Sequence, residues 1–388
     1  MDHVLFADAA LTPEGTLGPY WLRLVDERIV EAGHGRPPRG PDEHVTDAVV
    51  APGFVDVHAH GGGAAAFTDG AASGERALAA HRRRGTTTML ASLVSAPVSV
   101  LLEQAEELRP LVDSGELAGV HLEGPWLSQE HRGAHETDML SAPTPDAVST
   151  LLGHPARDLI RYVTLAPERD GAGEAIARMR AAGFTLGVGH TGASCDQTRE
   201  AIAAGATAAT HLFNGMKGLH HRDPGPALAL LEDPTAFLEL ISDGVHLDAE
   251  MVRFVWDYAT RNGGPQRPVL VSDAMPGAAA PDGRYRLGTV DVEVRDSVAR
   301  RVTPDGTLGA IAGSTLTLSA AVRESILRSS IDPALALMAA TSNPAEMIGI
   351  DDAGRLLPGG RADLVLLDSA WNVSRVMHRG GWIDDARA

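Results

Sequence analysis

The sequence predicts an α/β protein in which a (β/α)8 TIM barrel carries a small β-sandwich domain formed by the two chain ends. Short apolar runs rich in β-branched residues recur eight times between Val55 and Met275. Stretches with helical spacing separate these runs, and such alternation is typical of a closed parallel barrel. Outside that block, both ends of the chain show strand-like alternation interrupted by turn residues.

Eight strands are expected in the barrel, each ending in polar residues. They are Val55–His60, Thr86–Val94, Ala118–Gly124, Ile160–Glu168, Thr185–His190, Ala208–Asn214, Phe237–His246 and Val269–Met275. Helices are expected between them, among others at Glu75–Arg84, Val98–Leu111, Ala175–Ala182, Cys195–Ala204 and Ala249–Asn262. Ser194 and Gln197 have the spacing of a capping box at the start of one of these helices.

The chain divides into two expected domains. Residues 1–50 and 354–388 are expected to pair into the small β domain, and residues 51–353 to form the barrel. Residues 277–310 are rich in Gly, Asp and alternating Val, which predicts a hairpin insertion after the eighth strand. A helix from Leu316 to Leu327 then closes the barrel.

Composition excludes several classes of function. The net charge of −18 over 388 residues argues against nucleic acid or an anionic membrane as a partner, because the field repels polyanions. Cys195 is the one cysteine, so neither a disulfide framework nor a zinc-thiolate cluster can form within the chain. The N-terminus has no targeting pattern, and no run of about 18 apolar residues occurs, so we expect a cytoplasmic protein.

Histidine and acidic residues end six of the eight expected strands. They are His58 and His60, Glu123, His190, His211, Asp243 and His246, and Asp273. In such a barrel these strand ends meet at one face, where the active site lies. A single His is more often an ordinary hydrogen-bonded surface residue, which is the expectation for His81 in the helical segment Ala80–Arg84. Several ligand-type residues at one face instead favour a divalent metal site with an open position.

A metal at this face would suit the hydrolysis of an amide, which resists attack by neutral water. A bound divalent ion lowers the pKa of its water to about 7 and polarises a carbonyl oxygen. A further group must take the water proton and give it to the leaving nitrogen. Asp273, at the end of the last strand, is placed for that role, although an Asp there could also cap the next segment.

Several motifs resemble a known family. The segment from His58 to Gly61 together with Asp273 resembles the amidohydrolase superfamily. The segments HLEGP at 121–125 and HLFNGM at 211–216, in this order, are similar to the deacetylases of N-acetylglucosamine 6-phosphate within that superfamily. The resemblance extends along the whole chain. It implies removal of the N-acetyl group of that sugar phosphate, with a metal, most simply zinc, as cofactor.

The resemblance also implies residue roles. Glu123, His190 and His211 would hold the main metal, and Asp273 would be the general base and acid. His135 would polarise the acetyl carbonyl, which needs a hydrogen-bond donor at the developing oxyanion. Contacts to the sugar phosphate would come from Asn214, Gly215, Arg222 and His246, with Gly215 standing where Ala is usual. A neighbouring subunit can lend the phosphate contact in this family, so a homodimer is expected.

The number of metal ions stays open at this point. His58 and His60 are both present, so a second ion could bind beside them, with Glu123 bridging the two. A bridging carboxylated lysine is excluded, because the expected fourth strand Ile160–Glu168 contains no Lys.

Two other functions remain open. The nearest is deacetylation of another N-acetylhexosamine 6-phosphate, such as N-acetylgalactosamine 6-phosphate, which differs by the orientation of one hydroxyl. The other is an inactive barrel that serves as an interaction scaffold.

Overall fold

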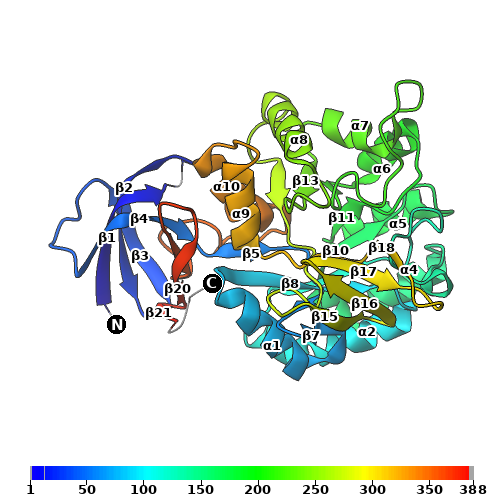
Figure 1. Ribbon diagram of the computed structural model, residues 1–388, viewed down its shortest axis with the longest axis horizontal. Coiled ribbons are helices and arrows are strands. Elements are labelled where there is room, and N and C mark those ends of the chain that lie inside the picture. The colour runs from blue at the N-terminus through cyan, green and yellow to red at the C-terminus, as the bar shows by residue number, and fades with distance from the viewer. Residues whose placement is uncertain (1, 13, 384–388) are drawn as a thin grey trace.

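The computed structural model describes residues 2–12 and 14–383 (Figure 1). Met1, Pro13 and the last five residues of the expected C-terminal β segment lie outside the described residues. A sheet made from both chain ends lies beside a larger α/β barrel, and Figure 1 shows them side by side along the long axis of the molecule. Within the described part of the chain, no helix combines the length and apolar character needed to cross a bilayer.

An eight-stranded parallel sheet forms the barrel, so the predicted fold class is confirmed. Its strands are β5 (Phe54–Asp56), β8 (Thr86–Val94), β9 (Gly119–Glu123), β10 (Ile160–Leu165), β11 (Thr185–Val188), β12 (Ala208–Ala209), β13 (Phe237–Leu240) and β14 (Pro268–Leu270). They follow one another in chain order around the barrel. The seam closes just beyond the first and last strands, where Ala59 and Ala274 form a parallel bridge. The backbone N–H of Asp273 also donates to the carbonyl of His58 across this seam, at 2.8 Å.

Helices separate successive strands and cover the outside of the barrel (Figure 1). They are α1 (Ala71–Arg82), α2 (Val98–Glu107), α3 (Arg109–Asp113), α4 (Pro145–Gly153), α5 (Ala172–Ala181), α6 (Cys195–Ala204), α7 (Gly225–Glu232), α8 (Ala249–Arg261), α9 (Leu318–Leu327), α10 (Pro333–Ala339) and α11 (Ser342–Met347). The capping box predicted from Ser194 and Gln197 opens α6. The single helix expected at 98–111 is two helices instead, and Pro110 lies in the first turn of the second, where a missing N–H costs little.

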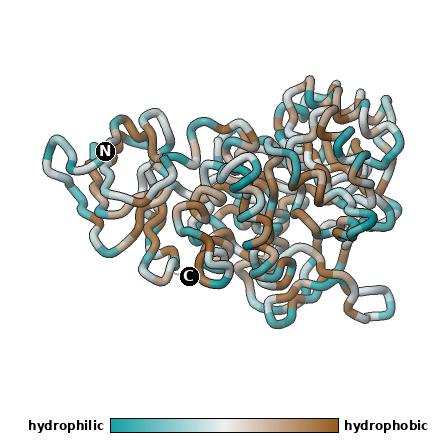
Figure 2. Tube along the Cα trace, turned by 90° about the horizontal axis from the view of Figure 1, so that it is seen from above, coloured by the Kyte–Doolittle hydropathy of each residue, from teal (hydrophilic) through white to brown (hydrophobic). Residues whose placement is uncertain are grey.

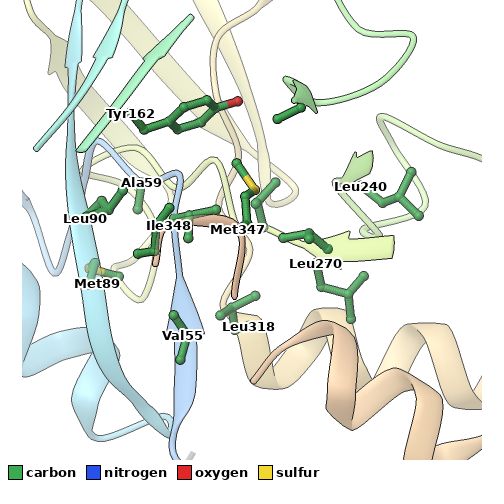
Figure 3. Close-up of a cluster of buried hydrophobic side chains, with 14 of the residues drawn as sticks. Val55, Ala59, Met89, Leu90, Tyr162, Leu240, Leu270, Leu318, Met347 and Ile348 are labelled. Carbon is green, nitrogen blue, oxygen red and sulfur yellow. The ribbon is translucent and has the colours of Figure 1, made fainter. Parts of the chain in front are cut away.

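The barrel core explains why the strand sequences are apolar almost throughout. β8 is buried at its first eight positions because one face of the strand meets the barrel interior and the other meets the helices. Figure 3 shows part of this core, in which Val55 and Leu90 of neighbouring strands lie near Leu318 and Ile348 from the C-terminal helical region. The strands are therefore held on both faces, which keeps the residues at their ends in fixed positions.

The chain ends form the predicted small β domain, and its strands belong to one seven-stranded sheet that closes on itself through a bridge between Arg28 and Arg361. Its strands are β1 (Asp2–Leu11), β2 (Leu17–Val25), β3 (Arg28–His34), β4 (Glu43–Pro52), β19 (Leu364–Leu367), β20 (Val373–His378) and β21 (Gly381–Trp382). β4 pairs with β1 on one side and with β19 on the other, so N-terminal and C-terminal strands share a single hydrogen-bonded sheet. Figure 2 shows hydrophobic stretches inside this part as well as inside the barrel.

The insertion after the last barrel strand is larger than predicted. In place of a hairpin it is a four-stranded antiparallel meander made of β15 (Gly283–Leu287), β16 (Val290–Arg295), β17 (Val298–Val302) and β18 (Leu308–Ile311). Asp296 and Ser297 form the two-residue loop between β16 and β17, and both have positive φ, as a type I′ turn requires. The insertion packs on the barrel through an apolar cluster that includes Met275 and Val292.

Arg267, just before β14, is a buried cation that joins α7 and α8. Only 1% of the residue is exposed. Its guanidinium donates to the carbonyls of Leu230, Leu231, Ala236 and Asn262 at 2.8, 3.1, 3.0 and 2.6 Å. Several of these carbonyls belong to helix ends, which lack acceptor partners within their own helix.

Replacing Arg267 by Met should lower the stability of the barrel markedly. The change leaves several buried carbonyls without donors, and each such group costs about 1–3 kcal/mol. Thermal unfolding followed by circular dichroism should show a clear fall in Tm. The matched control is Arg300→Met, because Arg300 is exposed and its guanidinium bonds to the carbonyl of Gly309 at 3.1 Å. Similar Tm values for the two variants would contradict the structural role of Arg267.

Candidate active site

The site lies at the carboxyl ends of the barrel strands, where the chain turns sharply. His190, His211 and Asp273 have φ angles of 47°, 29° and 48°, in the left-handed region that side-chain-bearing residues rarely adopt. Each follows the last residue of a short strand by two or three positions. Such backbone strain is concentrated at functional sites in proteins. It explains why several expected strands end earlier than predicted, since the site residues occupy the turns that follow.

The carboxylate of Glu123 is the centre of the site. Five imidazoles surround it, and each directs Nε2 at a carboxylate oxygen: His58 at 3.5 Å, His60 at 3.2 Å, His135 at 3.2 Å, His190 at 3.1 Å and His211 at 3.0 Å. Asp273 lies on the far side of the first-strand pair, with Oδ1 at 3.3 Å from Nε2 of His60 and 3.5 Å from that of His58. The structure therefore brings Glu123, His190, His211 and Asp273 around one point.

The hydrogen bonds of Nδ1 show which tautomer the imidazoles of His60 and His190 adopt. Nδ1 of His60 donates to the carbonyl of Ser92 at 3.0 Å, and Nδ1 of His190 donates to the carbonyl of His131 at 2.9 Å. In the neutral ring, Nε2 of each is then an unprotonated acceptor directed at the centre. The Nε2 atoms of His190 and His211 lie 3.1 Å apart, which two lone pairs tolerate well around a shared cation.

His135 has the opposite arrangement. The backbone N–H of Ser95 donates to its Nδ1 at 3.3 Å, so in the neutral ring the proton is on Nε2. Burial lowers the pKa of His135 and favours that neutral form. Its Nε2–H is therefore a hydrogen-bond donor facing the site, whereas the Nε2 atoms of His60 and His190 are acceptors when those rings are neutral.

The donor set fits a divalent metal ion. Two groups of side chains have ligand atoms within 4.8 Å of one another: His58, His60 and Glu123 in one, and Glu123, His190 and His211 in the other. The buried Nε2 of His58 has no hydrogen-bond partner within the described residues, as expected of an atom kept free for a metal. Imidazole nitrogen and carboxylate oxygen are typical ligands of Zn²⁺ and similar ions.

The electrostatics of the site favour a bound cation. Burial acts to lower the pKa of His60, but the carboxylates of Asp273 and Glu123 outweigh burial and raise that pKa to about 9. Burial acts to raise the pKa of Asp273, but His58 and His60 outweigh it and lower that pKa to about 2. Asp273 is therefore ionised at neutral pH, and the surrounding negative charge attracts either protons or a metal.

A cavity of about 270 Å³ opens above this cluster. Its lining includes the predicted substrate residues His135, Asn214, Gly215 and His246. A side chain at Gly215 would bring Cβ within 2.6 Å of Nδ1 of His190, so glycine lets the backbone approach that ring closely. Arg222 is not among the lining residues; it is exposed, and its guanidinium bonds to the ring of His221 at 2.8 Å.

The insertion supplies the outer wall of the cavity, which the sequence did not reveal. Leu287, Thr289, Val290 and Ile311 of the meander all line it. An ion pair between Arg301 of β17 and Glu136 ties this wall to the loop that carries His135, at 2.7 Å. The insertion therefore encloses one side of the cavity and also holds one of the site loops.

Three buried acidic or histidine residues beneath the site were also missed. They are Asp56, His121 and Glu239, all with 0% exposure. Two of them had a sequence signal, because Asp56 lies two positions before His58 and His121 two before Glu123, which places each pair on one face of a strand. Glu239 is an acidic residue within the otherwise apolar run FLEL. The surface position expected for His81 was wrong, since the residue is buried and its Nε2 donates to the carbonyl of Gly61 at 2.9 Å.

Comparison with known proteins agrees with this geometry. The sequence model of the amidohydrolase family matches residues 49–383 of this chain. The chain belongs to the amidohydrolase family. As a member of it, the chain is a metal-dependent hydrolase, which makes the inactive scaffold the weaker alternative.

Individual amidohydrolases resemble the chain along most of its length. An N-acetylgalactosamine-6-phosphate deacetylase of Escherichia coli O157:H7 is 35% identical over 98% of this chain and 99% of its own. An N-acetylglucosamine-6-phosphate deacetylase of Vibrio furnissii is 33% identical over 86% of this chain and 83% of its own. The solved structure of a variant N-acetyl-D-glucosamine-6-phosphate deacetylase of Mycobacterium smegmatis, in complex with N-acetyl-D-glucosamine 6-phosphate, has a TM-score of 0.91 and 43% identity. That match covers 98% of this chain and 99% of the other.

Proposed function

We propose that this amidohydrolase removes the N-acetyl group of N-acetylglucosamine 6-phosphate, giving glucosamine 6-phosphate and acetate. The observation that carries the proposal is the convergence of Glu123, His190, His211 and Asp273 at the floor of a cavity large enough for a small molecule. Full-length relatives that act on N-acetylhexosamine 6-phosphates support the substrate class.

The proposed cofactor is zinc, which Glu123, His190 and His211 would hold, and a second ion could be held by His58, His60 and Glu123. Such an ion lowers the pKa of water and polarises the amide carbonyl. The metal-binding nitrogens must be unprotonated, so we expect metal affinity to fall as the pH falls.

Asp273 and His135 have distinct roles in this proposal. The ionised carboxylate of Asp273 accepts a proton from the attacking water and then delivers it to the leaving nitrogen. Nε2–H of His135 donates a hydrogen bond to the acetyl oxygen as negative charge develops there. The Ser95 N–H, which fixes the proton of His135 on Nε2, keeps this donor in the required form.

Binding of the sugar phosphate is assigned to Asn214, Gly215 and His246 within the chain. Nδ1 of His246 bonds to Oδ2 of Asp243 at 2.7 Å, which holds the ring at the cavity edge. Arg222 lies outside its own cavity, which supports a homodimer in which Arg222 reaches the phosphate bound by the partner subunit. A planar guanidinium suits a phosphate because it donates two hydrogen bonds at once. A cytoplasmic location belongs to the same proposal, since a charged sugar phosphate does not cross membranes unaided.

Kinetics on two epimeric substrates test the assignment. We expect purified, metal-loaded enzyme to release acetate with a higher kcat/KM from N-acetylglucosamine 6-phosphate than from N-acetylgalactosamine 6-phosphate. The galacto substrate is the second candidate, because a relative named for it matches almost the whole chain. A higher kcat/KM for N-acetylgalactosamine 6-phosphate would make that compound the assigned substrate. If neither compound released acetate, the proposed function would be wrong.

Asp273→Asn should abolish most turnover while leaving the metal bound. The amide keeps the size of the side chain but cannot accept the water proton, so kcat should fall by about 100-fold or more. Metal content measured by elemental analysis serves as the control and should match the unmodified enzyme. Retained turnover, or loss of metal in step with activity, would exclude the assigned role.

Arg222→Ala should mainly raise KM for the phosphorylated sugar, by roughly tenfold, because a charge-assisted contact worth about 1.5–3 kcal/mol is lost. Steady-state kinetics on the phosphorylated and unphosphorylated sugars separate this effect from general damage. The matched control is Arg261→Ala, a change to another exposed arginine, at the end of α8. Equal losses of kcat/KM on both sugars would contradict a phosphate contact.

A further inference from the structure

Glu239 is a buried carboxylate that the proposed reaction does not use. It lies in the middle of β13 and has 0% exposure. Its Oε2 accepts a hydrogen bond from Nδ1 of His58 at 3.1 Å and another from the backbone N–H of His211 at 3.0 Å. One carboxylate thus joins the first and sixth strand ends, and both partners belong to the groups that fit a metal.

The free-energy cost of burying the carboxylate of Glu239 must be offset by other interactions. A buried carboxylate is costly unless it is paired and hydrogen-bonded. Oε1 of Glu239 has no hydrogen-bond partner within the described residues, so its hydrogen bonds satisfy only part of the group. Because this carboxylate contacts His58, its costly burial points to a role in the metal centre itself.

The contact determines which nitrogen of His58 faces the site. An ionised carboxylate only accepts hydrogen bonds, so Nδ1 of His58 must carry the proton, and in the neutral ring Nε2 is the free lone pair. His60 and His190 obtain the same orientation from backbone carbonyls. His58 alone among these three has a charged partner, and a carboxylate on the outer nitrogen raises the basicity of an imidazole ligand.

We propose that Glu239 is a positioning residue that fixes the proton and ring orientation of His58, and so sets the affinity of the His58–His60–Glu123 group for a divalent ion. The backbone N–H of His211 anchors the carboxylate while it does so. The inference rests on the metal centre of the proposed function and not on the identity of its substrate.

Metal binding by Glu239→Gln tests this role. Glutamine keeps the shape of the side chain, and its carbonyl oxygen can accept both N–H donors in the place of Oε2, but the neutral amide removes the negative charge that holds the proton on Nδ1 of His58. Titration of the metal-free full-length protein with Co²⁺ against a competing chelator, followed by visible absorption, measures the affinity directly. We expect about 10- to 100-fold weaker binding of one ion.

A double-mutant cycle shows whether Glu239 acts through His58. On a His58→Gln background, Glu239→Gln should change the Co²⁺ affinity by less than about twofold, because the partner it orients is gone. The matched control is Asp363→Asn in the end sheet, another buried carboxylate, which accepts a bond from the backbone N–H of Arg379 at 2.8 Å. That variant should bind Co²⁺ as the unmodified protein does.

Unchanged Co²⁺ affinity in folded Glu239→Gln would overturn the proposal, and so would an equal loss on the His58→Gln background. If Glu239→Gln does not fold, as judged by circular dichroism, Glu239→Asp replaces it, because the shorter side chain loses the contact with His58 while keeping the charge. Binding is measured without substrate, so a protein that binds Co²⁺ normally but releases no acetate would overturn the proposed function alone.

Discussion

The buried charge of Glu123 is the constraint around which the site is organised. A carboxylate this deep is stable only with close partners, and here imidazoles occupy all sides of it. The rings come from separate parts of the chain, so their mutual distances depend on the parallel barrel that sets the strand ends side by side. The fit of the cluster to a cation follows from that arrangement, whereas the outer hydrogen bonds of the rings fix their proton positions.

A layer of uncharged hydrogen bonds beneath the site keeps this charged cluster in place. Nε2 of His121 bonds to Thr164 at 2.8 Å, and Thr210 links Thr164 to the hydroxyl of Tyr162 at 2.8 and 2.7 Å. On the other side, Nδ1 of His121 bonds to Ser92 at 2.9 Å. Together these bonds cross four barrel strands, and such satisfied buried networks make a core rigid. Rigidity matters because metal ligands tolerate only small displacements.

The sequence revealed the barrel and the residues at its mouth because both leave local signals. Strand runs alternate with helices, and a polar residue such as Glu123 or His190 at the end of an apolar run stands out. The shape of the end sheet left no such signal, since whether β4 has one neighbour or two depends on pairing between residues far apart in the chain. Glu239 was missed for a related reason: its partners, His58 and a backbone N–H, become neighbours only when the barrel closes.

Because of the meander of β15–β18, the wall of the cavity and the residues proposed for catalysis come from different parts of the chain. The floor of the cavity is built from strand ends, whereas Leu287, Thr289, Val290 and Ile311 belong to an insertion that contributes none of the imidazoles. Substitutions in that wall can reshape the space available to a bound molecule without disturbing the hydrolytic machinery. Evolution, or a protein engineer, can therefore change what such an enzyme accepts while inheriting its chemistry intact.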